Sequence, residues 1–317
     1  MEKNRIFVVG DVHGQLNLLK ALEDQIKNDG DNYQIILTGD LMDRGCDSYQ
    51  TFLYVFNNPK ISSILGNHDD FFIKDEEHNW KKLDWAIING GEETFDSILR
   101  YYNENPEQIK KMNWGEDLKL KHWLISKFYY EWCASQLFMY PKLVEKAKEV
   151  YSTEDQDRAI INFLHEILIS INNQFKTLPY IMLIEHSNQK YVLTHSGAVA
   201  TRDKYIDGNK STQIVVHTEK LANEEKEEIL WARDTRLCKL YPRKARVNDH
   251  IVLHGHTPKF DNETYIIKRD GKIAVVNLDG GAGYLHHYKT ARLRAIELGS
   301  NTIYTVDKNC KVEIKQI

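Results

Sequence analysis

Five short segments place acidic, amide and imidazole side chains directly after apolar runs. They are GDVHG at 10–14, GDLMDRG at 39–45, GNHD at 66–69, THSG at 194–197 and HGHTP at 254–258. Taken singly, each segment is a weak signal, because an isolated aspartate often caps a helix and an isolated histidine often lies in a core. Taken together, they indicate one polar site built from several strand ends.

The side chains in these segments have the chemistry of metal ligands. Carboxylate, amide and imidazole groups without a thiolate suit divalent ions such as Mn²⁺, Fe²⁺ or Zn²⁺. Asp11 and His13 are two residues apart, so in extended backbone their side chains point to the same side. With added water, the set is large enough for two ions. The candidate ligands are Asp11, His13, Asp40, Asn67, His195 and His256.

These ligands can meet only if the strands before them lie side by side. Apolar runs predict strands at 5–10, 33–40 and 61–67, and helical spacing of leucine and isoleucine predicts a helix after the first of them. This alternation within about 70 residues is typical of βαβ units with a parallel sheet. Ligands of such sheets bind at the carboxyl ends of the strands.

The second half of the chain is expected to be mainly antiparallel, with hairpins turning at SNQ and RDGK. The stretch at about 101–177 has helical periodicity instead. We therefore predict an α/β fold, a sandwich of two mixed β-sheets packed together and flanked by helices. We expect a single domain over residues 1–317, with a helical insertion at about 101–177, either as a cap over the site or as a packed subdomain.

Composition narrows the class of protein. The chain has 317 residues, a hydrophobic fraction of 42% and a formal net charge of −4, which disfavours nucleic-acid binding by bulk positive charge. Four scattered cysteines form no CxxC pair, and we see neither a signal peptide nor an apolar run long enough to span a membrane. We expect a cytoplasmic protein; the sequence does not indicate its oligomeric state.

The five segments, in this order, resemble the calcineurin-like metallophosphoesterase superfamily. Within it they resemble the phosphoprotein phosphatase branch, especially its compact bacterial and phage enzymes. The resemblance covers residues 5–100 and about 178–290. It implies that one metal is held by Asp11, His13 and His256, and the other by Asn67 and His195. It also implies that Asp40 bridges the two ions, for which Mn²⁺ is the first expectation and Fe²⁺/Fe³⁺, Zn²⁺ and Ni²⁺ are alternatives.

The same resemblance implies hydrolysis of phosphate esters by a hydroxide that bridges the two metals. His68 would be the general acid at the leaving oxygen, and Asp43 would orient it. Arg44 and Arg233 would contact the phosphate beside Asn67, because a guanidinium matches phosphate geometry. For Asp43 a turn-capping role is the alternative, and for Arg233 a surface ion pair.

The substrate is less determined, because LGNHD has Leu65 where many protein phosphatases of this branch have arginine. LGNHD resembles the symmetrical diadenosine tetraphosphate hydrolases, yet those enzymes commonly lack the aspartate that this chain keeps as Asp43. Leu65 could equally be a packing change. We thus expect a phosphorylated protein, or a dinucleoside polyphosphate or other nucleotide, as substrate. Nucleic-acid end processing and an inactive metal-binding scaffold are the less favoured hypotheses.

Aromatic residues of the helical stretch offer one way to bind a nucleotide. They could stack on a base, or they could pack in the core, which is the more common role of such side chains. The residues are Trp114, Trp123, Phe128, Tyr129, Tyr130 and Trp132.

Overall fold

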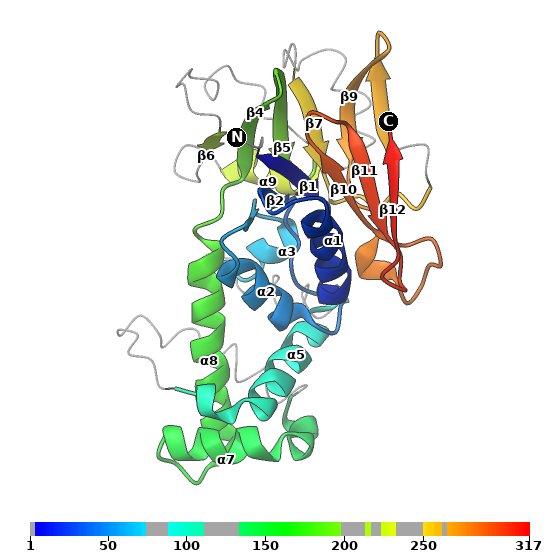
Figure 1. Cartoon of the computed structure of the whole chain (residues 1–317). Helices are drawn as coiled ribbons and strands as arrows, with labels where there is room; N and C mark the ends of the chain where they lie inside the picture. Colours follow the sequence, from blue (N-terminus) through cyan, green and yellow to red (C-terminus); the bar gives the residue numbers. More distant parts are fainter. Residues whose placement is uncertain are drawn as a thin grey trace.

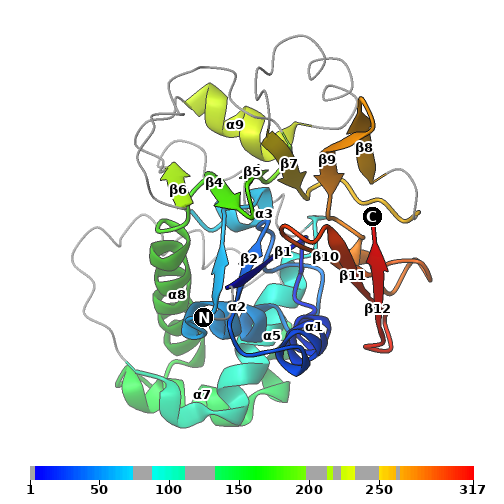
Figure 2. The ribbon, with the colours of Figure 1, turned by 45° about the horizontal axis from the view of Figure 1, so that its top comes forward.

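Two six-stranded β-sheets and a set of helices make up the fold (Figures 1 and 2). The computed structural model describes the following residues: 4–73, 88–110, 133–197, 213–216, 223–232, 250–261 and 265–317. The predicted α/β fold with two mixed sheets is confirmed. None of the helices in these ranges is both long and apolar enough to cross a membrane.

The first sheet has a parallel half and an antiparallel half. In the parallel half, β1 (Arg5–Val9) pairs with β2 (Tyr33–Leu37), and β2 with β3 (Ile61–Ser63). The helices α1 (Leu16–Asn28) and α2 (Ser48–Asn57) connect these strands, as the βαβ prediction requires. The antiparallel half consists of β10 (Leu293–Glu297), β11 (Thr302–Val306) and β12 (Val312–Gln316).

Two details of this sheet differ from the expectation. The strand predicted at 61–67 ends at Ser63, and Asn67 begins a short helix, α3 (Asn67–Asp70). Asn67 therefore lies a few residues beyond the strand end, in the first turn of that helix. The strand β12 was not predicted. Its sequence, VEIKQ, is short and alternates apolar with charged or polar residues, and its side chains are largely exposed.

The second sheet has the strand order β6-β4-β5-β7-β9-β8. Its strands are β6 (Gln213–Val216), β4 (Ile181–His186), β5 (Gln189–Thr194), β7 (His250–His254), β9 (Lys272–Asn277) and β8 (Ile266–Arg269). Hairpins join β4 to β5 and β8 to β9, as expected. However, β5, β7 and β9 are parallel, so the expectation of a mainly antiparallel second half is wrong for the centre of this sheet. That parallel pairing brings the ends of β5 and β7 to one edge.

The remaining long helices lie outside the two sheets. The helices α5 (Gly91–Glu104), α7 (Pro141–Val150) and α8 (Gln156–Phe175) extend away from the sheets, and α5 also packs against α2 (Figure 1). The helix α9 (Asn223–Trp231) lies beside the second sheet (Figure 2). The six aromatic residues proposed for base stacking fall within 111–132, outside the described residues, and the single-domain organisation stays a prediction.

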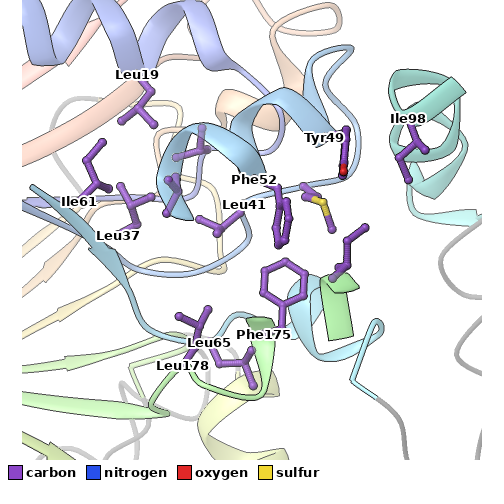
Figure 3. Packing of buried hydrophobic residues seen from close by; sticks show 14 of the residues in the cluster. Leu19, Leu37, Leu41, Tyr49, Phe52, Ile61, Leu65, Ile98, Phe175 and Leu178 are labelled. Atoms are coloured by element: carbon purple, nitrogen blue, oxygen red, sulfur yellow. The ribbon is translucent and has the colours of Figure 1, made fainter. Parts of the chain in front are cut away.

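Both faces of β1, in the middle of the first sheet, are buried. Alternate residues of β1 enter different clusters: Ile6 and Val8 pack between the sheets, whereas Phe7 and Val9 pack with the helices. Burial of each such side chain contributes about 1.5–3 kcal/mol. The cluster that contains Phe7 and Val9 also includes Leu65, which is 0% exposed and lies near Phe175 and Leu178 (Figure 3). Its side chain thus belongs to the apolar core, as the packing interpretation of LGNHD requires.

Candidate active site

The loops that follow the central strands of both sheets meet at one buried place. Asp11 follows β1, and the amide of His13 donates to the carbonyl of Asp40, at 2.9 Å, after β2. In the second sheet the amide of Gly255, after β7, donates to the carbonyl of His195, after β5, at 2.9 Å. All of these loops leave the carboxyl ends of parallel strands, which explains why residues far apart in sequence meet here.

Asp40 lies at the centre of the candidate ligands. One of its oxygens, Oδ2, is 3.4 Å from Nε2 of His13, and the other, Oδ1, is 3.5 Å from Nε2 of His195. Asp40 also belongs to both groups of potential metal-binding side chains whose ligand atoms lie within 4.8 Å of one another. These groups are His13 with Asp40 and His68, and Asp11 with Asp40 and His195. An aspartate so placed can face two ions at once.

Asn67 joins the histidines of the second sheet to this group. Its Oδ1 is 2.7 Å from Nε2 of His195 and 2.9 Å from Nδ1 of His256. The amide of His256 in turn donates to Oδ2 of Asp11 at 2.8 Å. The structure therefore brings all six sequence-predicted ligands together.

The electrostatics of this group favour a bound cation. Burial, followed by the nearby carboxylate of Asp279 and that of Asp40 itself, raises the pKa of Asp11 well above its usual value. Burial and then Asp69 do the same to the pKa of Asp40. Burial lowers the pKa of His195 to about 3, so its imidazole is neutral and has a lone pair to offer. Buried carboxylates that repel each other, beside neutral imidazoles, fit divalent ions.

His68 is paired with Asp43 at the edge of the ligand group. Its Nδ1 lies 2.7 Å from Oδ2 of Asp43, and both side chains are almost completely buried. Burial raises the pKa of Asp43 to about 7, opposed by its hydrogen bond from Thr94 and by the charge of Arg44. The hydrogen bond fixes the ring of His68 and leaves Nε2 directed away from Asp43. The geometry expected of an oriented histidine is thus present.

Arg44 lies between the candidate ligands and His68. Its Nη1 is 2.6 Å from Nε2 of His13, and its Nη2 is 2.9 Å from Nε2 of His68. The guanidinium carbon also lies 4.8 Å from the ring centre of Tyr284, within cation–π range. The two terminal nitrogens of the guanidinium therefore face the imidazoles of His13 and His68.

Strained backbone accompanies these side chains. His13, Asp40, Asp43, Arg44 and His256 all have positive φ, between 47° and 70°. Positive φ is uncommon for any residue other than glycine, although asparagine, aspartate and histidine adopt it more often than the rest, and an instance costs on the order of 1–3 kcal/mol. Such strain persists only where neighbouring contacts fix the backbone, and it concentrates at functional sites.

Three supporting residues were missed by the sequence reasoning. Thr38 donates to Oδ1 of Asp11 at 2.8 Å. The carboxylate of Asp69 accepts the amides of Asp40, Leu41 and Gly66 at 2.8, 2.9 and 3.0 Å, which ties the loops after β2 and β3 together. Asp69 stands three residues after Gly66, a spacing typical of a helix start, and could have been found from that signal. Thr94 lies far from the motifs in sequence and had no such signal.

Comparison with known proteins agrees with this geometry. The sequence matches the family model of the calcineurin-like phosphoesterases over residues 4–280. This family match indicates a hydrolase acting on phosphoester bonds. The chain belongs to the calcineurin-like phosphoesterase family.

Two kinds of relative are similar in sequence, one over most of the chain and one over a shorter part. The chain is 25% identical to serine/threonine-protein phosphatase 2 of Salmonella typhimurium over 268 residues, 82% of this chain and 85% of the relative. It is 30% identical to a symmetrical bis(5'-nucleosyl)-tetraphosphatase of Pseudomonas putida over 118 residues, 37% of each chain. Among solved structures, a putative diadenosine tetraphosphatase is similar over 96% of this chain and 93% of its own, with 16% identity and a TM-score of 0.42.

Proposed function

We propose that this chain is a phosphomonoesterase of the serine/threonine protein phosphatase type. The observation that carries the proposal is the 2.7 Å hydrogen bond between Asp43 and His68, since the tetraphosphatases that LGNHD resembles commonly lack this aspartate. The long match to a bacterial serine/threonine-protein phosphatase, over 82% of the chain, supports the same choice.

We further propose that the site holds two divalent ions, with Mn²⁺ the first candidate. Asp11, His13 and His256 would hold one ion, Asn67 and His195 the other, and Asp40 both. The two oxygens of Asp40, each facing a different histidine at 3.4 or 3.5 Å, support this arrangement. When bound, the ions supply Lewis-acid chemistry: they acidify water to provide the nucleophile and offset the charge of the phosphoryl group.

His68 then protonates the leaving oxygen from Nε2. Asp43 accepts the hydrogen bond from Nδ1–H, which fixes the ring. Its carboxylate favours the charged imidazolium that carries the proton, against burial and the charge of Arg44, which lower the pKa of His68 well below its usual value. This step is expected to contribute about 10²–10⁴ in rate. Arg44, whose two terminal nitrogens now lie at His13 and His68, would turn its donors to the phosphate beside Asn67. A second contact from Arg233 is proposed from the sequence alone, because that residue lies outside the described ranges.

Symmetrical cleavage of dinucleoside tetraphosphates is the second candidate function. The observation in its favour is the 30% identity to a symmetrical tetraphosphatase over 118 residues. The burial of Leu65 in the apolar core weakens its use as a marker of nucleotide substrates, because the side chain lies among hydrophobic neighbours.

Product analysis distinguishes these functions. The purified protein, supplied with Mn²⁺, receives a phosphoserine peptide, p-nitrophenyl phosphate and diadenosine tetraphosphate in parallel, with the His68→Asn variant as a control for contaminating activity. Release of inorganic phosphate from the peptide, with the dinucleotide intact, is the expected result. Conversion of the dinucleotide to two ADP with the peptide untouched would establish the second function and overturn the first.

A further inference from the structure

We propose that Thr94, in the second turn of α5, is a positioning residue for the Asp43–His68 pair. This inference rests on the proposed role of His68 as general acid. It adds a contact from a helix that none of the sequence motifs includes, and it makes the start of α5 part of the site.

The contacts of Thr94 with Asp43 are reciprocal. The amide of Asp43 donates to Oγ1 of Thr94 at 3.1 Å, and the hydroxyl of Thr94 donates to Oδ1 of Asp43 at 2.7 Å. Thr94 and Asp43 are both 0% exposed, so water does not compete for these bonds. Because Thr94 occupies Oδ1, the other oxygen of Asp43, Oδ2, faces Nδ1 of His68. The hydroxyl of Thr94 thereby orients the carboxylate of Asp43, and this carboxylate orients the ring of His68.

The backbone of the Asp43–Arg44 segment depends on the same helix start. Both residues have φ of 69°, a conformation that side chains of their kind seldom adopt. Thr94 accepts the amide of Asp43, and the carbonyl of Gly90, just before α5, accepts the amide of Arg44 at 2.8 Å. The amides of Asp43 and Arg44 are thus both accepted by residues 90–94 at the start of α5. These two hydrogen bonds together fix the strained backbone conformation.

Loss of the Thr94 hydroxyl should affect proton transfer selectively. A buried carboxylate that loses one of its donors is free to rotate, and the hydrogen bond to His68 is then shared between orientations. Proton donation matters most when the leaving oxygen is strongly basic. The defect should therefore be larger for phenyl phosphate than for p-nitrophenyl phosphate, whose leaving group departs with little protonation. A purely structural role would slow both reactions equally.

Ser97 provides a matched control on the same helix. It is also 0% exposed, and its hydroxyl donates to the carbonyl of Thr94 at 2.7 Å and accepts the amide of Tyr49 at 2.9 Å. Ser97→Ala removes a buried hydroxyl one turn further along α5, whose bonds go to the carbonyl of Thr94 and to Tyr49 of α2 rather than to Asp43.

The experiment measures kcat for both esters, with Mn²⁺, in Thr94→Val, Thr94→Ser, Ser97→Ala, Asp43→Asn and His68→Asn, alongside thermal melting of each. We expect Thr94→Val to lower kcat for phenyl phosphate roughly 10-fold to 100-fold, the effect of losing one hydrogen bond to a charged group, and that for p-nitrophenyl phosphate much less. Thr94→Ser should restore the wild-type ratio of the two rates, and Ser97→Ala should keep it. Thr94→Val combined with Asp43→Asn should be no slower than Asp43→Asn alone.

The outcomes separate this inference from the proposed function. If His68→Asn and Asp43→Asn change the ratio but Thr94→Val leaves it at the wild-type value, the role of Thr94 is wrong and the general acid stands. If His68→Asn itself leaves the ratio unchanged, the general-acid assignment fails first. Should Thr94→Val not fold, Thr94→Ala takes its place, and a wild-type ratio in that variant overturns the inference.

Discussion

Left-handed backbone occurs both in the hairpin turns and in the candidate active site, but among the described residues histidine and arginine adopt it only in the site. The turn between β4 and β5 uses Ser187 and Asn188, and the turn between β8 and β9 uses Asp270 and Gly271, all with positive φ. Asn301, before β11, has φ of 54°. Apart from Ser187, these residues are glycine, asparagine or aspartate, which tolerate this conformation, so their types suit the backbone geometry of the turns.

In the site, the same conformation is imposed on residues with chemical side chains. His13, Arg44 and His256 have φ of 47°, 69° and 70°. Arginine rarely adopts that backbone and histidine does so less readily than glycine, so hydrogen bonds between the loops hold it. One of them is the bond from the amide of His256 to Asp11, at 2.8 Å. In the turns, the residue types suit the backbone conformation. In the site, the backbone adopts a strained conformation that directs the side chains toward one another.

The largest expected effect comes from Asp40, the centre of the site. Asp40→Asn should remove both ions, because it deletes the anion that faces both histidines, and turnover should fall on the order of 10⁴-fold or more. Metal content by mass spectrometry, with steady-state rates, measures this. Asp24→Asn, at a residue on α1 whose side chain is 74% exposed, is the matched control and should keep both properties. A variant at Asp40 that retains two tightly bound ions would disprove the ligand assignment.

The next effect separates chemistry from metal binding. His68→Asn should lower turnover of a phosphomonoester with a basic leaving group about 10²–10⁴-fold, since it removes the proton donor, while metal content stays near the wild-type level. His186→Asn, at the end of β4 in the hairpin turn, is the control. If the ions are lost from His68→Asn, the residue is a ligand and not the general acid.

Substitution of two glycines allows a direct comparison of the site, beside Gly90, with a hairpin turn, at Gly271. Gly90 has φ of 91°, and a Cβ there would lie 2.8 Å from the amide nitrogen of Arg44, whereas Gly271 has φ of 75° and open space around it. Gly271→Ala should cost about 1 kcal/mol of unfolding free energy with unchanged activity. Gly90→Ala should cost about 1–3 kcal/mol and also raise KM, because it displaces Arg44. Equal kinetics in the two variants would remove the functional contrast between the regions.

The smallest effect is expected at a turn. Asn301→Gly keeps a residue that tolerates positive φ, so the free energy of unfolding should change by no more than about 0.5 kcal/mol and kcat/KM should not change. Chemical denaturation and initial rates are the measurements. A loss of activity here would show that turn geometry far from the motifs also controls the site.

The sequence predicted the part of the site that follows from local pattern. Asp11, Asp40 and His195 were found because each follows an apolar strand, and parallel pairing brings those strand ends together. Thr94 and Thr38 were missed, because their roles arise only when α5 and β2 pack against the loops. Such contacts have no local signature.

The fold shows the same division. The βαβ units and the hairpins were predictable from periodicity and turn residues, whereas the parallel order of β5, β7 and β9 depends on long-range pairing. The exact ends of elements were also less predictable, since β3 gives way to α3 within the predicted strand. The cytoplasmic location, the identity of the metal and the role of Arg233 stay predictions.

The central claim is that loops from both sheets form one site for two metal ions, and anomalous diffraction tests it most directly. Crystals grown with Mn²⁺ would be measured at the manganese absorption edge. The account predicts two anomalous peaks, one contacted by Asp11 and His256, the other by Asn67 and His195, with Asp40 touching both. A single peak, or peaks contacted by other residues, would contradict it.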